Sequence, residues 1–368
     1  MNPFISPEEL KNKFVDFARN SESKLSIIFG AGASYGYSRD RNFIYRPPTV
    51  SELLKDNNPL VKSVIEKPEH GAIKGQRAHI ERSIKSFEGD LEAYLSDIYS
   101  NDTDDNLFPR MLRYLEDIFT LVSQYVDLDD NYYQNLLSRV RDLRGRKPWS
   151  ILTFNYDTIL EQSVANLQRW IPAKTFNTDL DYLGSNPKLL KMHGGINIRY
   201  ISVPPPEKAD GVSLHDLFTE MMANNKPTDT YLEFKQLDYP VPNLREHRTL
   251  KDIGGAIVCN FPLMMIPIHT AVQTENSFFS RQIEQSKDEI SQSGLVIAVG
   301  YQFGDNTFID ALKELDLKES TLILVGTKTL VQEGIESRSF KNASRAWPKE
   351  NIHIFGGDGF DEFTGSLF

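Results

Sequence analysis

The first candidate for acid–base chemistry is His193, in the segment Lys191-Met192-His193-Gly194-Gly195. This histidine ends a predicted strand, 188–192, and two glycines follow it. An imidazole with an unperturbed pKa of about 6.5 exchanges protons near neutral pH, so it suits a general base. The remaining histidines lack such a setting and are predicted to be structural or surface residues. No pair of them has the helical spacing of metal ligands beside an acid: His70, His79, His215, His247, His269 and His353.

Two polar residues follow another predicted strand, 149–154, in the segment Thr153-Phe154-Asn155-Tyr156-Asp157. The side chains of Asn155 and Asp157 can both orient a polar ligand. Helix capping is the alternative, and it is the commoner role for such residues directly before an apolar helical segment.

A glycine-rich turn, Gly30-Ala31-Gly32-Ala33-Ser34, comes directly after the apolar run 25–29. Glycines let a backbone approach a phosphate closely with its N–H groups free of side-chain obstruction, and the start of a helix adds a favourable dipole. The turn therefore indicates nucleotide binding, although a tight structural turn explains its glycines equally well.

A second turn follows the predicted strand 295–299 and reads Gly300-Tyr301-Gln302-Phe303-Gly304-Asp305. Gly300 would let the backbone approach a ligand, and Tyr301 could stack on it or form a hydrogen bond with it. Asp305 can cap the helix that follows. A plain strand-to-helix turn is the alternative.

The elements that must position these residues form a predicted α/β fold. The strand runs are short, apolar and not alternating, and helical stretches separate them, as in a mostly parallel Rossmann-like sheet with helices on both faces. Residues 6–20 read as a helix with a capping box formed by Ser6 and Glu9. The later predicted strands are 149–154, 188–192, 256–259, 295–299, 321–325 and 352–355. Loops after parallel strands meet at the carboxyl edge of the sheet, where ligands bind.

Residues 52–147 carry apolar residues at helical spacing without compact strand runs. We therefore predict a Rossmann-like domain made of 1–51 and 148–368, with 52–147 as an all-helical insertion. Residues 201–248 are rich in proline and charge, which indicates a surface excursion or a lid.

Composition excludes several classes of function. The net charge is −10, from 41 Lys and Arg against 51 Asp and Glu, so direct nucleic-acid binding by this chain is not expected. The only cysteine, Cys259, cannot form an internal disulfide or a four-cysteine zinc site, which fits a reducing cytoplasm. The sequence shows no signal peptide and no apolar stretch of about 18 residues that would span a membrane.

Taken together, the segments resemble the pattern of the sirtuin and SIR2-like family, in the family's order. The matching positions are Gly30 to Ser34, Thr153 to Asp157, His193-Gly194 and Gly300 to Asp305. Three departures separate the chain from protein deacylases. The zinc cysteines are missing, Pro47-Pro48-Thr49 and Ser51-Glu52-Leu53 stand where deacylases end a motif in Asp-Phe-Arg, and a long helical segment replaces a small insertion. These departures resemble the bacterial SIR2-like NADases of antiphage defence, most of all the stand-alone SIR2 subunit that pairs with a HerA-like ATPase.

The resemblance implies hydrolysis of NAD to ADP-ribose and nicotinamide without zinc, and it implies a role for each site residue. Asn155 would orient the nicotinamide ribose and the attacking water, and His193 would act as general base. Asp157 would hold the nicotinamide amide. The turn of Gly30, Ala31, Gly32 and Ser34 would cradle the pyrophosphate, while Gly300 and Tyr301 would lie near the adenosine half. A homo-oligomer and a HerA-like ATPase partner are also implied.

Two other functions remain open from the sequence. An NAD-dependent protein deacylase would share the motifs, although the missing cysteines count against it. A non-catalytic nucleotide-sensing assembly module would use the helical segment as an interface.

Overall fold

The architecture was obtained from a computed structural model of the chain. The structure describes residues 3–38, 40, 43–87, 91–101, 107–128, 131–166, 175–176, 187–202, 233–236, 251–253, 256–264, 277–326, 328–356 and 359–367.

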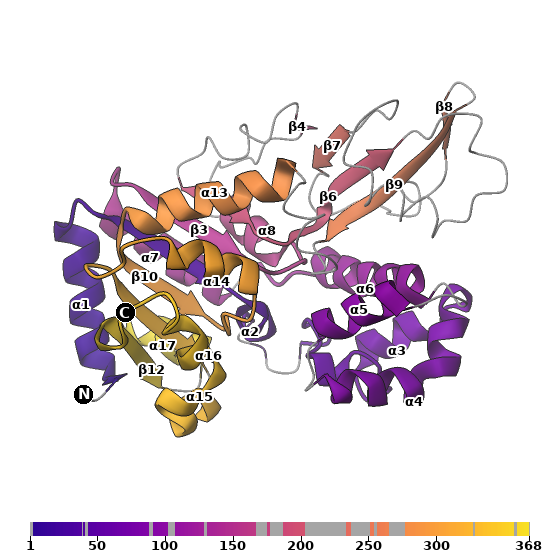
Figure 1. Ribbon diagram of the computed structural model, residues 1–368, viewed down its shortest axis with the longest axis horizontal. Helices are drawn as coiled ribbons and strands as arrows, with labels where there is room; N and C mark the ends of the chain where they lie inside the picture. The colour runs from indigo at the N-terminus through magenta and orange to yellow at the C-terminus, as the bar shows by residue number, and fades with distance from the viewer. Residues whose placement is uncertain are drawn as a thin grey trace.

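A seven-stranded sheet, parallel throughout, forms the centre of the fold (Figure 1). Its order is β1-β12-β11-β10-β2-β3-β5. The strands are β1 (Phe4–Ile5), β2 (Lys24–Phe29), β3 (Trp149–Thr153), β5 (Lys188–Lys191), β10 (Ser293–Val299), β11 (Thr321–Gly326) and β12 (Ile352–Gly356). The predicted mostly parallel, Rossmann-like α/β class is therefore confirmed.

Helices cover both faces of this sheet, and successive residues of β2 show how. Ile27 and Phe29 belong to one buried core, which includes residues of α1 (Pro7–Asn20), α7 (Tyr132–Arg144), α8 (Ile159–Asn166) and α17 (Phe360–Ser366). Ile28 belongs to a second core, which includes residues of α13 (Ser277–Ser291), α14 (Asn306–Lys313) and α16 (Arg338–Ala343). Because side chains alternate across a strand, a continuous apolar run supplies both layers.

The start of α1 follows the predicted capping box. The Glu9 N–H donates to Ser6 Oγ at 3.2 Å, and the Ser6 N–H donates to the Glu9 carboxylate at 3.0 Å. These two bonds satisfy N–H groups that the first turn of a helix leaves without partners.

The described residues of the segment 52–147 form helices and no strand, as predicted (Figure 1). These are α3 (Pro59–Ile65), α4 (Gly71–Ser86), α5 (Leu91–Asn101), α6 (Leu107–Gln124) and α7, with short 3-10 turns at Val50–Glu52 and Pro68–His70. Helices α3 to α6 gather beside the sheet, whereas α7 packs against α1, α8 and α17. The boundaries of the insertion at 52 and 147 stay a prediction.

A second, antiparallel sheet has the order β4-β7-β6-β9-β8. Its strands are β4 (Thr175–Phe176), β6 (Gly194–Ser202), β7 (Glu233–Gln236), β8 (Lys251–Ile253) and β9 (Ala256–Met264). The prediction that the run 256–259 belongs to the parallel sheet is therefore wrong, because these residues pair with β6 and β8. The predicted excursion 201–248 includes the end of β6 and all of β7, and its remainder lies outside the described residues.

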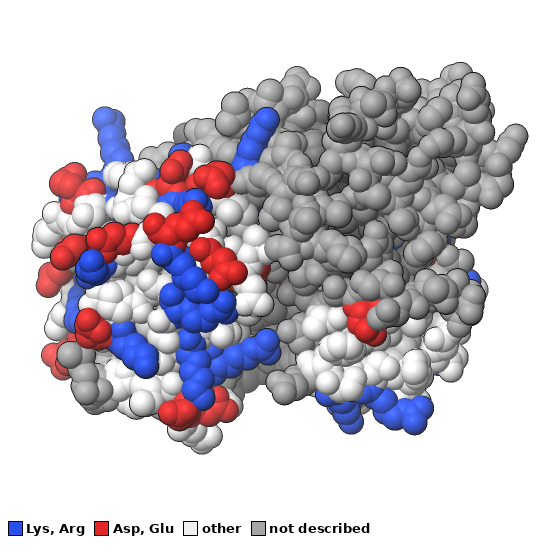
Figure 2. Space-filling model, in the orientation of Figure 1, with Lys and Arg blue, Asp and Glu red and all other residues white. Residues whose placement is uncertain are grey.

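Charged side chains of both signs are interspersed over the sheet and its helices on the face shown in Figure 2. Ion pairs connect several of the charged residues in this part of the chain. Lys313 and Lys341 lie 2.7 Å from Asp310 and Glu336, and Lys287 lies 2.6 Å from Glu314. Among the described helices, none combines the length and the apolar character that a membrane span requires.

Candidate functional site

The four sequence segments singled out above meet at one edge of the parallel sheet. They follow β10, β2, β3 and β5, which are consecutive neighbours in it. From β2 the chain continues to β3 and β5 on one side, and it returns to β10 on the other, so the strand order reverses between β2 and β10. In open α/β sheets, ligands bind outside the carboxyl ends of the strands at such a switch point.

The two glycine turns touch each other at this switch point. A Cβ on Gly300 would lie 2.3 Å from the Ala33 nitrogen, and one on Gly30 would lie 2.5 Å from the Gly300 oxygen. Gly300 has a φ of +61°, and its carbonyl accepts the Gly32 N–H at 3.1 Å. Close backbone packing therefore accounts for these glycines, and the helix that follows, α2 (Ala31–Tyr35), is short. The role of Gly30, Ala31 and Gly32 toward a phosphate stays a prediction.

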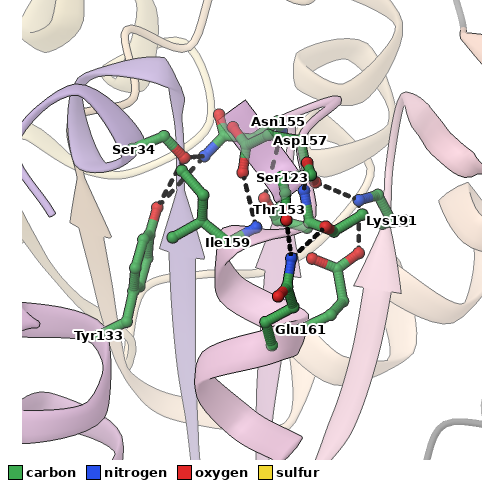
Figure 3. Close-up of polar contacts among 11 residues, drawn as sticks. Ser34, Ser123, Tyr133, Thr153, Asn155, Asp157, Ile159, Glu161 and Lys191 are labelled. Atoms are coloured by element: carbon green, nitrogen blue, oxygen red, sulfur yellow. Dashed lines mark hydrogen bonds and ion pairs between the residues drawn. The ribbon is translucent and has the colours of Figure 1, made fainter. Parts of the chain in front are cut away.

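Asn155 lies directly beside the glycine turn, and its contacts fix the orientation of its carboxamide (Figure 3). Its Nδ2 donates to the Gly30 carbonyl at 3.1 Å and to Ser34 Oγ at 2.9 Å. Because a carbonyl oxygen only accepts, the atom facing Gly30 must be the NH2 group. The Asn155 Oδ1 is buried and has no hydrogen-bond partner within the described part of the chain.

Asp157 is 3 % exposed, and its Oδ1 accepts the Ile159 N–H at 3.0 Å, at the start of α8. The capping alternative therefore applies to this residue. Burial raises the pKa of the Asp157 carboxyl, and the Lys191 ammonium, the Ile159 N–H and the Ser34 hydroxyl oppose that rise only in part. The Ser34 hydroxyl interacts with the Asp157 carboxyl, so Asp157 lies next to the glycine turn. The predicted contact of Asp157 with a nicotinamide amide stays a prediction.

A buried ion pair lies beneath this loop and was missed from the sequence. Lys191 and Glu161 are both fully buried and in direct contact, and Lys191 Nζ also donates to the Asp157 carbonyl at 2.7 Å (Figure 3). Burial raises the pKa of Glu161, and the opposing charge of Lys191 does not cancel that rise. The available signal was a lysine at the end of a buried apolar strand, which needs a partner in the interior.

His193 pairs with Asp305, a residue that the sequence placed only as a helix cap. Its Nε2 lies 2.9 Å from Asp305 Oδ2, and the other carboxylate oxygen accepts the Phe308 N–H of α14 at 3.1 Å. Burial would raise the pKa of Asp305, but His193 and the N–H groups of Thr307 and Phe308 hold it below its ordinary value. An ionised carboxylate only accepts, so Nε2 carries a proton and donates it to Asp305. Nδ1 is the ring nitrogen that would accept a proton in general-base chemistry.

Aromatic rings surround this pair. The Phe154 ring meets the His193 ring edge-on at 4.9 Å, and it stacks on Tyr301 at 4.0 Å with an interplanar angle of 15°. One face of Tyr301 is therefore covered by protein, which restricts a ligand to its other face or its edge. The predicted contact of Tyr301 with the adenosine half of a nucleotide stays a prediction.

Within the described ranges, one group of side chains has the spacing of metal ligands, and it lies away from this edge. Glu69, His70 and Asp117 belong to the helical segment. Asp117 already contacts His70 at 2.8 Å and the ammonium of Lys67 at 3.4 Å. The Lys67 ammonium therefore already provides a positive charge beside the Asp117 carboxylate.

No protein-family model matches the sequence, and no curated protein matches it. Three solved sirtuin structures are similar at low identity. A Sir2 homologue in complex with NAD is 10% identical, with 97% of this chain and 92% of that chain covered and a TM-score of 0.39. Sir2Tm bound to a propionylated peptide is 11% identical, with 97% and 99% covered and a TM-score of 0.39. A sirtuin from work on substrate affinity is 11% identical, with 96% and 97% covered and a TM-score of 0.42. Similarities this low do not assign the chain to a family. The fold class therefore rests on the strand order, and the candidate site rests on the contacts described above.

Proposed function

We propose that this chain hydrolyses the N-glycosidic bond of NAD and releases nicotinamide and ADP-ribose. The observation that carries the proposal is that Asn155, His193 and Asp305 all follow strands at one edge of the parallel sheet, with Asn155 bound to the glycine turn and His193 bound to Asp305. We infer NAD as the substrate from the order of the sequence motifs, which resembles the SIR2-like pattern.

The reaction demands little covalent chemistry from the protein. Nicotinamide is bound as a cation in NAD and leaves as a neutral molecule, while positive charge builds on the ribose. Water then adds to the ribose carbon and gives up a proton. Positioning and electrostatic stabilisation are sufficient to accelerate such a step.

The side chains divide this work. Asn155 Oδ1 accepts a hydrogen bond from a ribose hydroxyl or from the water, since its NH2 group is held by Gly30 and Ser34. His193 takes the proton, and Asp305 holds the imidazole in place and stabilises its charged form. Asp157 binds the nicotinamide amide in this proposal.

The nucleotide backbone lies across the two glycine turns in the same proposal. Gly30, Gly32 and Ser34 take the pyrophosphate side, and Gly300 and Tyr301 take the adenosine side. The support for this placement is the position of both turns at the carboxyl ends of β2 and β10, where the strand order reverses.

Burial of the two reactive side chains supports a restrained enzyme. Asn155 is 6 % exposed and His193 is 5 % exposed, so little of either side chain faces solvent. We place the enzyme in the cytoplasm, in antiphage defence by NAD depletion, where uncontrolled turnover would harm the host. From the sequence resemblance, we propose that the chain forms a homo-oligomer and that a HerA-like ATPase partner controls its activity.

Nicotinamide release from NAD tests the proposal, with the chain alone and with the HerA-like ATPase. Asn155→Ala and His193→Ala are expected to abolish turnover. The exposed residues Asn57 and His79 provide matched controls, and Asn57→Ala and His79→Ala are expected to leave turnover unchanged. An absence of NAD consumption in both arrangements would contradict the proposal. Formation of O-acyl-ADP-ribose that depends on an acylated peptide would replace hydrolysis by deacylation.

A further inference from the structure

A residue of the helical segment reaches the site from α7. Tyr133 is 0 % exposed, and its hydroxyl lies 3.0 Å from Ser34 Oγ and 3.4 Å from Asn155 Nδ2 (Figure 3). Ser34 is 121 positions and Tyr133 is 22 positions from Asn155 in the chain. Three separate parts of the sequence therefore meet in one buried group of polar atoms.

The direction of the hydrogen bonds in this group follows from Asn155. Its NH2 group only donates, so Ser34 Oγ must accept from it. Burial raises the pKa of the Tyr133 phenol well above its ordinary value, so the hydroxyl keeps its proton at any physiological pH. The phenol can then donate to Ser34, whose own proton is directed toward the buried Asp157 carboxylate.

This group holds the Asn155 carboxamide in one orientation. Both protons of Nδ2 are engaged on the side of Gly30, Ser34 and Tyr133, which turns Oδ1 to the opposite side. A buried acceptor without a partner destabilises a fold, so its retention needs an explanation. A substrate hydroxyl or water that binds there supplies one.

We propose that Tyr133 is a positioning residue, which acts through Ser34 to keep Asn155 Oδ1 turned toward the substrate. The proposal rests on the proposed NAD hydrolysis. It makes α7 part of the site, although α7 belongs to the segment predicted as an insertion.

The ring of Tyr133 is anchored independently of its hydroxyl. It packs edge-on against Phe29 at 4.9 Å and against Phe360 at 5.2 Å, and it stacks near Tyr37 at 6.4 Å. Tyr133→Phe keeps these contacts and removes only the hydroxyl. Tyr114→Phe is the matched control, because Tyr114 is equally buried in α6 and its hydroxyl donates to the Leu53 carbonyl.

The test measures kcat and KM for nicotinamide release with the full chain, in the form in which the wild type is active. Tyr133→Phe is expected to lower kcat on the order of 10- to 100-fold with little change in KM, because misplacement of one reacting group costs that much. Tyr114→Phe should retain the wild-type kcat. Ser34→Ala combined with Tyr133→Phe should lose no more than the worse single variant, since both act on the same carboxamide.

A crystal structure of Tyr133→Phe separates this inference from the proposed function. The expected result is an Asn155 carboxamide that has rotated away from the Gly30 carbonyl. An unchanged carboxamide, or a wild-type kcat in Tyr133→Phe, overturns the inference while NAD hydrolysis stands. A wild type that neither binds nor consumes NAD overturns the proposed function, and the orientation of Asn155 in the variant still decides the positioning role.

Discussion

His193 and Asp305 form a hydrogen-bonded pair at 2.9 Å across 112 positions of the chain. The carboxylate is fixed at the start of α14 by its bond to the Phe308 N–H, so it holds the imidazole from a rigid element. One carboxylate oxygen of Asp305 thus caps the helix, and the other binds the candidate base.

Asp305→Asn tests this pair. The substitution keeps the size of the side chain and an oxygen for the Phe308 N–H, but it removes the charge that stabilises a protonated imidazole. We expect kcat for nicotinamide release to fall by about 100-fold, which is the range of a general-base contribution. Asp310→Asn on the same helix alters only exposed ion pairs to Lys313 and Arg345 and should leave kcat unchanged. Equal kcat values for Asp305→Asn and the wild type would remove Asp305 from the mechanism.

Asp157→Asn should stabilise the fold at neutral pH while it impairs the enzyme. The folded-state pKa of Asp157 is raised, so between the ordinary and the raised pKa the folded chain binds more protons than the unfolded chain. Stability from this group is therefore present at low pH and is lost as pH rises through that window. The amide keeps an acceptor for the Ile159 N–H and removes the ionisation.

Thermal unfolding of wild type and Asp157→Asn across pH measures this effect. The variant should melt at a higher temperature near neutral pH, and the difference should shrink on acidification. A variant that is less stable than the wild type at neutral pH would show that the Asp157 charge is well compensated by Lys191.

Lys191→Met should destabilise the fold strongly, because it leaves Glu161 buried without its partner. Loss of one member of a buried ion pair costs about 3–5 kcal/mol. The double variant Lys191→Met with Glu161→Leu should recover most of that loss, since no buried charge remains. Urea denaturation measures both variants. A Lys191→Met variant as stable as the wild type would show that Glu161 does not need Lys191 as its buried partner.

Gly300→Ala should disrupt the contact of the two glycine turns. A Cβ there meets the Ala33 nitrogen at 2.3 Å and the backbone has a φ of +61°. Left-handed strain and overpacking together cost about 2–5 kcal/mol. Gly75→Ala is the control, since Gly75 lies inside α4 with no atom within 4 Å of the added methyl. It should stabilise the chain by about 0.5–1 kcal/mol. Denaturant midpoints that rank the two variants in the opposite order would contradict this account.

Most of the parallel sheet could be predicted because β2, β3, β5, β10, β11 and β12 each carry an apolar run of their own. Strand β1 was not predicted, because its two residues, Phe4 and Ile5, are too few to form such a run. A run such as Ile27-Ile28-Phe29 needs apolar neighbours on both faces, and only a covered sheet provides them. The run at 256–259 is also apolar, but it joins the antiparallel sheet. The apolar character of a strand does not specify which strand it pairs with. Residues 196–200 alternate between apolar and polar side chains, a pattern typical of a strand, and they lie in β6.

The members of the candidate site could be proposed from the sequence only where a residue directly follows a strand. Asn155, His193 and Gly300 fall in this class, and the structure brings their segments to one edge. Tyr133 and Asp305 do not, because their roles depend on contacts between distant segments. Tyr133 lies within a helical pattern and reads as core, and Asp305 reads as a cap, which it also is.

Only Met192 and His193 separate the end of β5 at Lys191 from the start of β6 at Gly194. The two sheets are thus joined by a short link whose second residue is the candidate base, and Gly194 turns the chain with a φ of +66°. Asp305 follows β10 of the parallel sheet, so its hydrogen bond to His193 lies where the chain passes from one sheet to the other. The position of the candidate base therefore depends on the geometry of both sheets.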